Sequence, residues 1–141
     1  MSASVYNLRK RGKPATASSS VPDGFTRLDE FNASKNKYGQ FSGIKGTGVD
    51  ETTIWVKEYA GSVLLWWEDP YKQVDDFIYT GKSQTDIDDC NAEYGMKSGY
   101  TWHHTGYPTD EAYGTMQLVP TFEHERLSHV GGAMISRGGK K

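Results

Sequence analysis

The chain has 141 residues, of which 16 are basic and 18 are acidic, so its formal net charge is −2. This length suits one domain with a buried core, and the small net charge excludes a typical, highly basic nucleic-acid-binding protein. The single cysteine, Cys90, excludes an internal disulfide and fits a reducing environment. No apolar run is long enough for a membrane span or a signal peptide, so we predict a soluble protein.

Charge is unevenly distributed along the chain. Residues 1–20 carry four basic side chains and no acidic one, and residues 99–141 carry four of each, so residues 21–98 have a net charge of −6. The first segment is also rich in small polar residues, which predicts a flexible basic arm or linker over residues 1–20 and a single folded domain over residues 21–141. Contact with a phosphate backbone must then come from the two ends of the chain or from a bound metal ion.

The first elements predicted in the folded part are a short helix over residues 25–31 and a glycine-rich loop over residues 36–48. A β-hairpin follows, because two β-prone runs, residues 52–59 and 62–67, flank the tight-turn pair Ala60-Gly61. The hairpin holds three tryptophans, most of which we expect to pack in a core or sheet rather than to stack on nucleic-acid bases: Trp55, Trp66 and Trp67.

Residues 83–94 form the next predicted helix. Ser83 is the expected N-cap, and Asp86 is its expected partner in a capping box. Two acidic pairs precede this helix, at residues 68–69 and 75–76, and neither has the alternating oxygen ligands and central glycine of a calcium loop. We interpret these pairs as solvated turns or as an acidic surface.

All four histidines lie in the last third of the chain: His103, His104, His124 and His129. Imidazole is the commonest side-chain metal ligand and a natural general base near neutral pH. The surrounding pattern predicts a strand over residues 100–104, a second strand over residues 116–119 and a helix over residues 122–129. Thr121 is the expected N-cap of this helix, and Gly131-Gly132 is its expected end. This order of elements predicts a compact ββα unit that carries the histidines.

The spacing of the histidines limits how they can meet. His103 and His104 are adjacent on a predicted strand, so their side chains point to opposite faces. We therefore expect one of them to bind a metal ion and the other to activate water. His124 and His129 are five residues apart, which separates them by roughly 140° on an ideal helix. They meet at one ion only if the helix ends before His129.

The residues around these histidines resemble a known family. The segment GYTWHH, followed by GTMQLVP, a histidine, four residues and HVGG, is closely similar to the WHH family of HNH/endonuclease VII-type nucleases, known as toxin domains of bacterial polymorphic toxin systems. The resemblance covers about the last third of the chain. Together with the predicted hairpin and helices, it implies an α+β fold with a small antiparallel sheet and a C-terminal ββα-metal (His-Me finger) motif at about residues 99–133.

The resemblance also implies roles for individual residues. The implied metal ligands of one divalent cation are His103, His124 and His129. His104 is the implied general base, and the roles of His103 and His104 could be exchanged. Gln117 falls where HNH enzymes place the asparagine that braces the active-site loop.

Three neutral imidazole ligands suit zinc, nickel or another transition ion better than magnesium, which would need an oxygen ligand from Glu123 or Glu125. We therefore predict a metal-dependent endonuclease that hydrolyses phosphodiester bonds, with DNA favoured over RNA as its substrate. The alternative is a structural zinc module that binds nucleic acid or protein without catalysis. A closed structural zinc site normally uses cysteines, however, and this chain has one.

As a toxin domain, the nuclease would be exported by a carrier system and would act in the cytoplasm of a target cell. A small amount of active nuclease would kill the cell that makes it. We therefore expect a cognate immunity protein as a partner, and no membrane contact. An excised domain of a longer toxin and a free-standing relative both fit the sequence.

Overall fold

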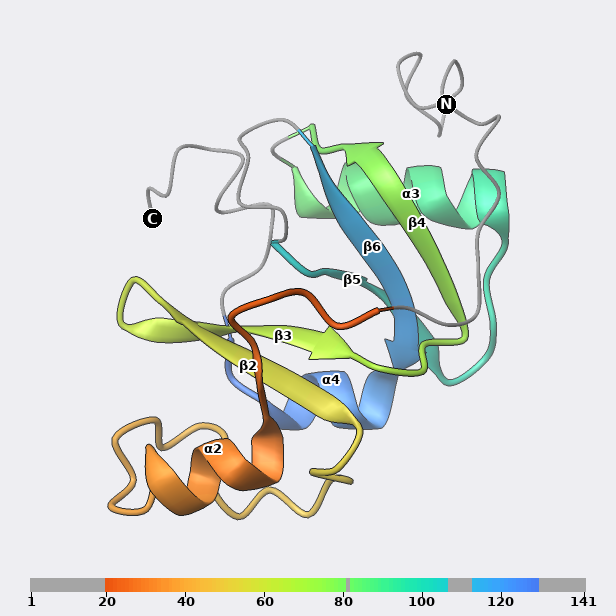
Figure 1. Cartoon of the computed structure of the whole chain (residues 1–141). Helices are drawn as coiled ribbons and strands as arrows, with labels where there is room; N and C mark the ends of the chain where they lie inside the picture. Colours follow the sequence, from red (N-terminus) through yellow and green to blue (C-terminus); the bar gives the residue numbers. More distant parts are fainter. Residues whose placement is uncertain (1–19, 81, 107–112, 130–141) are drawn as a thin grey trace.

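The computed structural model describes residues 20–80, 82–106 and 113–129 (Figure 1). Two predicted features, the basic arm except for Ser20 and the helix end at Gly131-Gly132, lie outside the described residues. The described elements, in chain order, are β1 (Thr26–Arg27), α2 (Leu28–Ser34), β2 (Ile54–Tyr59), β3 (Ser62–Trp67), β4 (Lys72–Ile78), α3 (Ser83–Tyr94), β5 (Tyr100–His104), β6 (Tyr113–Pro120) and α4 (Thr121–Arg126). Antiparallel sheets combined with helices confirm the predicted α+β class.

The first sheet has the strand order β1-β2-β3 and contains the predicted hairpin. Tyr59 pairs with Ser62 around the turn, and the two turn residues, Ala60 and Gly61, have φ values of 52° and 82°. Positive φ at both central positions is the geometry that matches the twist of the flanking strands. The hairpin is therefore confirmed, with its turn at the predicted pair.

The second sheet has the strand order β4-β6-β5, so β6 is its central strand. The pairing of β5 with β6 sets His103 opposite Gln117. The pairing of β4 with β6 shifts register between Val74 and Phe77. That irregularity breaks the apolar alternation by which a strand is recognised in sequence, which is why β4 was not predicted. Of the two interpretations of the acidic pair at residues 75–76, the turn is wrong, because the pair lies inside β4.

The fold has two main hydrophobic cores, one associated with each sheet. The first is formed mainly by the first sheet and α2, together with a residue of β6 and the residue that follows α4; its buried residues include Leu28, Phe31, Ile54, Leu65, Val119 and Leu127. The second lies between the second sheet and α3, as Figure 1 shows, and its buried residues include Val74, Phe77, Cys90, Trp102, Met116 and Leu118. Each fully buried side chain of this size contributes about 1.5–3 kcal/mol.

The helices occupy the predicted regions with corrected ends. The helix predicted over residues 25–31 is replaced by the short strand β1 followed by α2. The bounds of α3 agree with the prediction, but the predicted capping box is wrong. Lys82 is the N-cap, without a side-chain cap hydrogen bond, and the Asp86 side chain is buried. Similarly, Thr121 is the first residue of α4 and not its N-cap. Among the described residues, no helix has the length and apolar character needed to cross a membrane.

The two sheets are joined at Gln117, which is fully buried on β6. Its Oε1 accepts a hydrogen bond from the Trp67 backbone N–H at 2.9 Å, and its Nε2 donates to the Trp67 carbonyl, also at 2.9 Å. Nε2 also donates to Oε1 of Gln73 at 2.9 Å. Because β3 is an outer strand of its sheet, this amide supplies partners that a neighbouring strand would otherwise provide.

Replacing Gln117 with leucine should therefore destabilise the fold. The substitution removes the hydrogen bonds that the Gln117 amide makes to the backbone N–H and carbonyl of Trp67, so we expect a loss of roughly 2–4 kcal/mol in the free energy of unfolding, measured by urea denaturation. The control is Gln84→Leu, because the Gln84 side chain is exposed and donates to Asp88 at 2.9 Å. Its expected loss is below about 0.5 kcal/mol. Equal losses in the two variants would contradict the bridging role of Gln117.

Candidate metal centre

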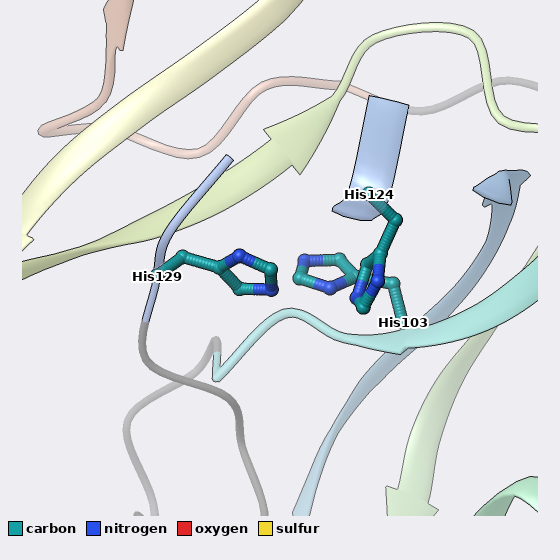
Figure 2. A group of neighbouring side chains, drawn as sticks. All are labelled: His103, His124 and His129. Carbon is teal, nitrogen blue, oxygen red and sulfur yellow. The ribbon is translucent and has the colours of Figure 1, made fainter. Parts of the chain in front are cut away.

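Three of the four histidines converge on one point from different parts of the C-terminal region. His103 comes from β5, His124 from α4 and His129 from the segment that follows α4 (Figure 2). Their potential ligand atoms all lie within 4.8 Å of one another. The ring centroids are 5.1 Å apart for His103 and His124, 5.0 Å for His103 and His129, and 4.8 Å for His124 and His129. Among the described residues, these three form the group that could hold a metal ion.

The end of α4 makes this convergence possible. The helix stops at Arg126, and Leu127 is extended, with φ −112° and ψ 112°. The buried Leu127 side chain joins the first core. The chain therefore leaves the helix before His129, and the ring of His129 turns back towards His124 as Figure 2 shows. This satisfies the condition that the five-residue spacing imposed.

Hydrogen bonds determine which ring nitrogen of His103 and of His129 is left to bind a metal ion. Nε2 of His103 lies 2.9 Å from the Leu65 carbonyl oxygen, which can only accept, so Nε2 carries the proton. Nδ1 of His103 is buried and has no hydrogen-bond partner in the described part of the chain. In the same way, Nδ1 of His129 donates to the Leu127 carbonyl at 2.5 Å, which leaves Nε2 unprotonated. Each ring presents one lone pair, as metal-ligating histidines held by outer contacts do.

Burial keeps the three rings neutral. It lowers the pKa of His103 well below 6.5, and the other two histidines of the cluster lower it further because a second positive charge there would be repelled. Burial also lowers the pKa of His124 to about 4 and that of His129 below its usual value. Neutral imidazole is the metal-binding form, and three nitrogen donors leave coordination positions open. The donor set thus fits a divalent transition ion.

His104 points to the other side of β5, as strand alternation predicts, and it contacts Asp86 and Tyr79. Its Nε2 lies 2.9 Å from Oδ2 of Asp86, and its ring centroid is 5.1 Å from that of Tyr79. A small cavity of about 130 Å³ nevertheless reaches all four histidines, and Ser83 and Ile87 of α3 also line it. His104 therefore borders the same space as the three clustered rings. Gln117 does not line this cavity.

Asp86 is the site residue that sequence reasoning missed. Its side chain is fully buried, and its Oδ1 accepts hydrogen bonds from the backbone N–H and the hydroxyl of Thr80 at 3.0 and 2.9 Å. A carboxylate that accepts from all its neighbours requires the proton on Nε2 of His104, which leaves Nδ1 as the proton acceptor. Cys90, one turn further along α3, is also buried. A carboxylate on the apolar side of a helix needs a buried partner, and this is the signal that could have identified Asp86.

Glu123, considered above as an oxygen ligand for magnesium, contacts a different group. Its Oε1 accepts a hydrogen bond from the Trp67 indole at 2.7 Å. Glu125, the other candidate, is exposed. Neither belongs to the group of potential ligands among the described residues. The donor set of the cluster is therefore three nitrogens.

Comparison with protein families identifies the segment that carries the histidines. Residues 93–139 match the family model WHH, described as a nuclease of the HNH/ENDO VII superfamily with conserved WHH. The matched segment begins near the end of α3 and contains β5, β6, α4 and all four histidines. The match confirms the resemblance seen in the sequence. No curated protein and no solved structure matches the chain.

The lowered pKa values of the clustered histidines predict acid sensitivity of the metal-free protein. In the unfolded chain these rings take up protons near pH 6.5, whereas in the fold they stay neutral to lower pH. The unfolded state then binds more protons, so stability should fall as the pH drops from 7 towards 5. Urea midpoints measured in chelator should show this fall, and His124→Gln should make it shallower. An identical pH dependence in both proteins would contradict the prediction.

Proposed function

We propose that this chain, whose residues 93–139 match the model of the WHH nuclease family, is a metal-dependent endonuclease that hydrolyses phosphodiester bonds, with DNA favoured over RNA. The observation that carries the proposal is the convergence of three neutral imidazoles beside a fourth imidazole backed by a buried carboxylate. This arrangement separates a metal-holding group from a proton-accepting group within one small cavity. Hydrolysis of a phosphodiester requires both.

The ligands of the proposed metal ion are His103, His124 and His129. The bond from His103 to Leu65 and the orphaned Nδ1 of His103 favour this histidine as the ligand, rather than an exchange of roles with His104. Zinc, nickel or another transition ion suits three nitrogen donors. When bound, such an ion would offset the negative charge on the scissile phosphate and on the departing oxygen.

His104 is the proposed general base, and Asp86 is its positioning residue. Asp86 holds the Nε2 proton, so Nδ1 is left to accept a proton from a water molecule. As that proton moves to Nδ1, the water oxygen forms a bond to phosphorus, and the bond from phosphorus to the leaving oxygen breaks. Gln117 has the bracing role in this scheme, because it fixes the edge of β3 against which His103 is held.

We also propose that the nuclease acts as a bacterial toxin domain, delivered by a carrier system into the cytoplasm of a target cell. The support is the likeness of the histidine-bearing segment to toxin nucleases. An enzyme that cuts the nucleic acid of any cell endangers the cell that makes it. A cognate immunity protein is therefore the expected protein partner.

The activity can be tested with the full chain and three substrates. We expect the purified protein to nick supercoiled plasmid DNA, to lose this activity in chelator, and to regain it with zinc or nickel better than with magnesium. Single-stranded DNA and RNA of matched sequence test the preference for DNA, and metal analysis should find one ion per chain. Bound zinc without cleavage of any substrate would instead support the structural zinc module.

Two alanine variants test the division of roles. His104→Ala should keep the metal ion and lower the cleavage rate by about 10²–10⁴-fold, because the proton acceptor is removed. His124→Ala should lose both metal and cleavage, because one of three ligands is removed. Metal analysis and single-turnover cleavage of the same preparations give the two readouts. Equal loss of metal in both variants would refute the assignment.

A further inference from the structure

We infer that Trp67, which lies outside the family-matched segment, is a positioning residue of the metal centre that holds His124 and keeps the Glu123 carboxylate away from the metal. This inference rests on the proposed function. Trp67 is the last residue of β3, and its side chain is only 3% exposed. It contacts the site through both its indole ring and its indole N–H.

The ring of Trp67 packs against two of the proposed ligands. Its centroid lies 5.1 Å from that of His103, with an interplanar angle of 67°, and 6.4 Å from that of His124, with an angle of 28°. The first contact is edge-to-face and the second is stacked. Because His103 and His124 come from different elements, one rigid indole fixes the orientation of both rings relative to each other.

The indole N–H holds the helix that carries His124. It donates to Oε1 of Glu123 at 2.7 Å, and Glu123 immediately precedes His124 in α4. This helix has six residues, no side-chain N-cap and no buried residue, so it has little stability of its own. A hydrogen bond to a carboxylate is stronger than one between neutral groups. The bond therefore anchors the first turn of α4 and with it the His124 ring.

The same bond affects which metal the site prefers. Glu123 is a hard oxygen donor next to a ligand, and a free carboxylate there would favour magnesium or manganese over softer ions. While one carboxylate oxygen accepts a hydrogen bond from the indole N–H, Glu123 is oriented towards β3. Trp67 thus preserves the three-nitrogen donor set.

The backbone of Trp67 is held in place independently of the indole ring. The backbone N–H and carbonyl of Trp67 both bond to the amide of Gln117, so the indole projects from a position held by two hydrogen bonds. A phenylalanine at position 67 would keep these backbone bonds and part of the ring packing. It would remove the hydrogen bond that the indole N–H donates to Glu123 and leave the backbone hydrogen bonds to Gln117 in place.

The chain offers a matched control in Trp55. Its indole N–H donates to Oε1 of Glu68 at 3.0 Å, and Trp55 lies in β2, the strand paired with β3. Trp55→Phe therefore removes the same type of bond from the same sheet. The Trp55 ring makes no described contact with a histidine. A general loss of stability should therefore appear in both Trp55→Phe and Trp67→Phe, whereas a loss of metal affinity should appear only in Trp67→Phe.

The test is a titration of the metal-free protein, comprising all 141 residues, with Co²⁺ and with Mg²⁺. Co²⁺ binding is followed by its visible absorption, which reports the donor set, and Mg²⁺ binding by calorimetry. Trp67→Phe should weaken Co²⁺ binding about 10- to 100-fold, the usual effect of removing an outer contact, and change the Co²⁺ spectrum. It should also raise the relative affinity for Mg²⁺. Trp55→Phe should stay within about twofold of the wild-type affinity.

Glu123 variants test the same contact from its other end. Glu123→Ala should weaken Co²⁺ binding as Trp67→Phe does, and combining the two should add little, because both remove one bond. Glu123→Gln keeps an acceptor for the indole and should restore most of the affinity. If Trp67→Phe fails to fold, the comparison of Glu123→Ala with Glu123→Gln tests whether the indole bond supports metal binding. Wild-type affinity in both Trp67→Phe and Glu123→Ala would overturn the inference and leave the proposed function standing, whereas a wild-type protein that binds no Co²⁺ and cuts nothing would overturn both.

Discussion

The open edge of β3 is the constraint on which the rest of the structure depends. As an outer strand that is buried, it needs partners for its backbone groups, and two side chains of the other sheet supply them. His103 donates to the Leu65 carbonyl, and the Gln117 amide bonds both backbone groups of Trp67. Because His103 and Gln117 face each other across β5 and β6, one cross-strand pair joins the two sheets.

That junction also determines the chemistry of the site. Because the single ring proton of neutral His103 lies on Nε2 and is donated in a hydrogen bond to the Leu65 carbonyl, Nδ1 is left with a lone pair and no hydrogen-bond partner among the described residues. An orphaned polar atom and three rings that must stay neutral are unfavourable in the metal-free fold. A cation that binds the fold and not the unfolded chain removes this cost and adds stability. Metal binding at the proposed site would thus be coupled to folding through the same contact.

Sequence reasoning could predict the parts of the structure that depend on local pattern. The Ala60-Gly61 hairpin, the opposite faces of His103 and His104, and the need for a helix end before His129 all follow from backbone geometry. The parts that depend on tertiary contacts could not be predicted in this way. A bulge hid β4, and Asp86 fits the spacing of a capping box although its real partner is 18 residues away. The indole bond to Glu123 spans 56 residues and has no local signal.

These long-range contacts bear on the extent of the nuclease domain. The family match begins at residue 93, yet Leu65, Trp67 and Asp86, which hold the histidines, all precede it. The matched segment therefore carries the imidazoles, while earlier strands and α3 set their tautomers and orientations. A metal centre loses function when its ligands are held loosely, since small displacements raise the barrier steeply. We therefore propose that the hairpin and α3 belong to the functional unit, within the single domain that the sequence predicts for residues 21–141.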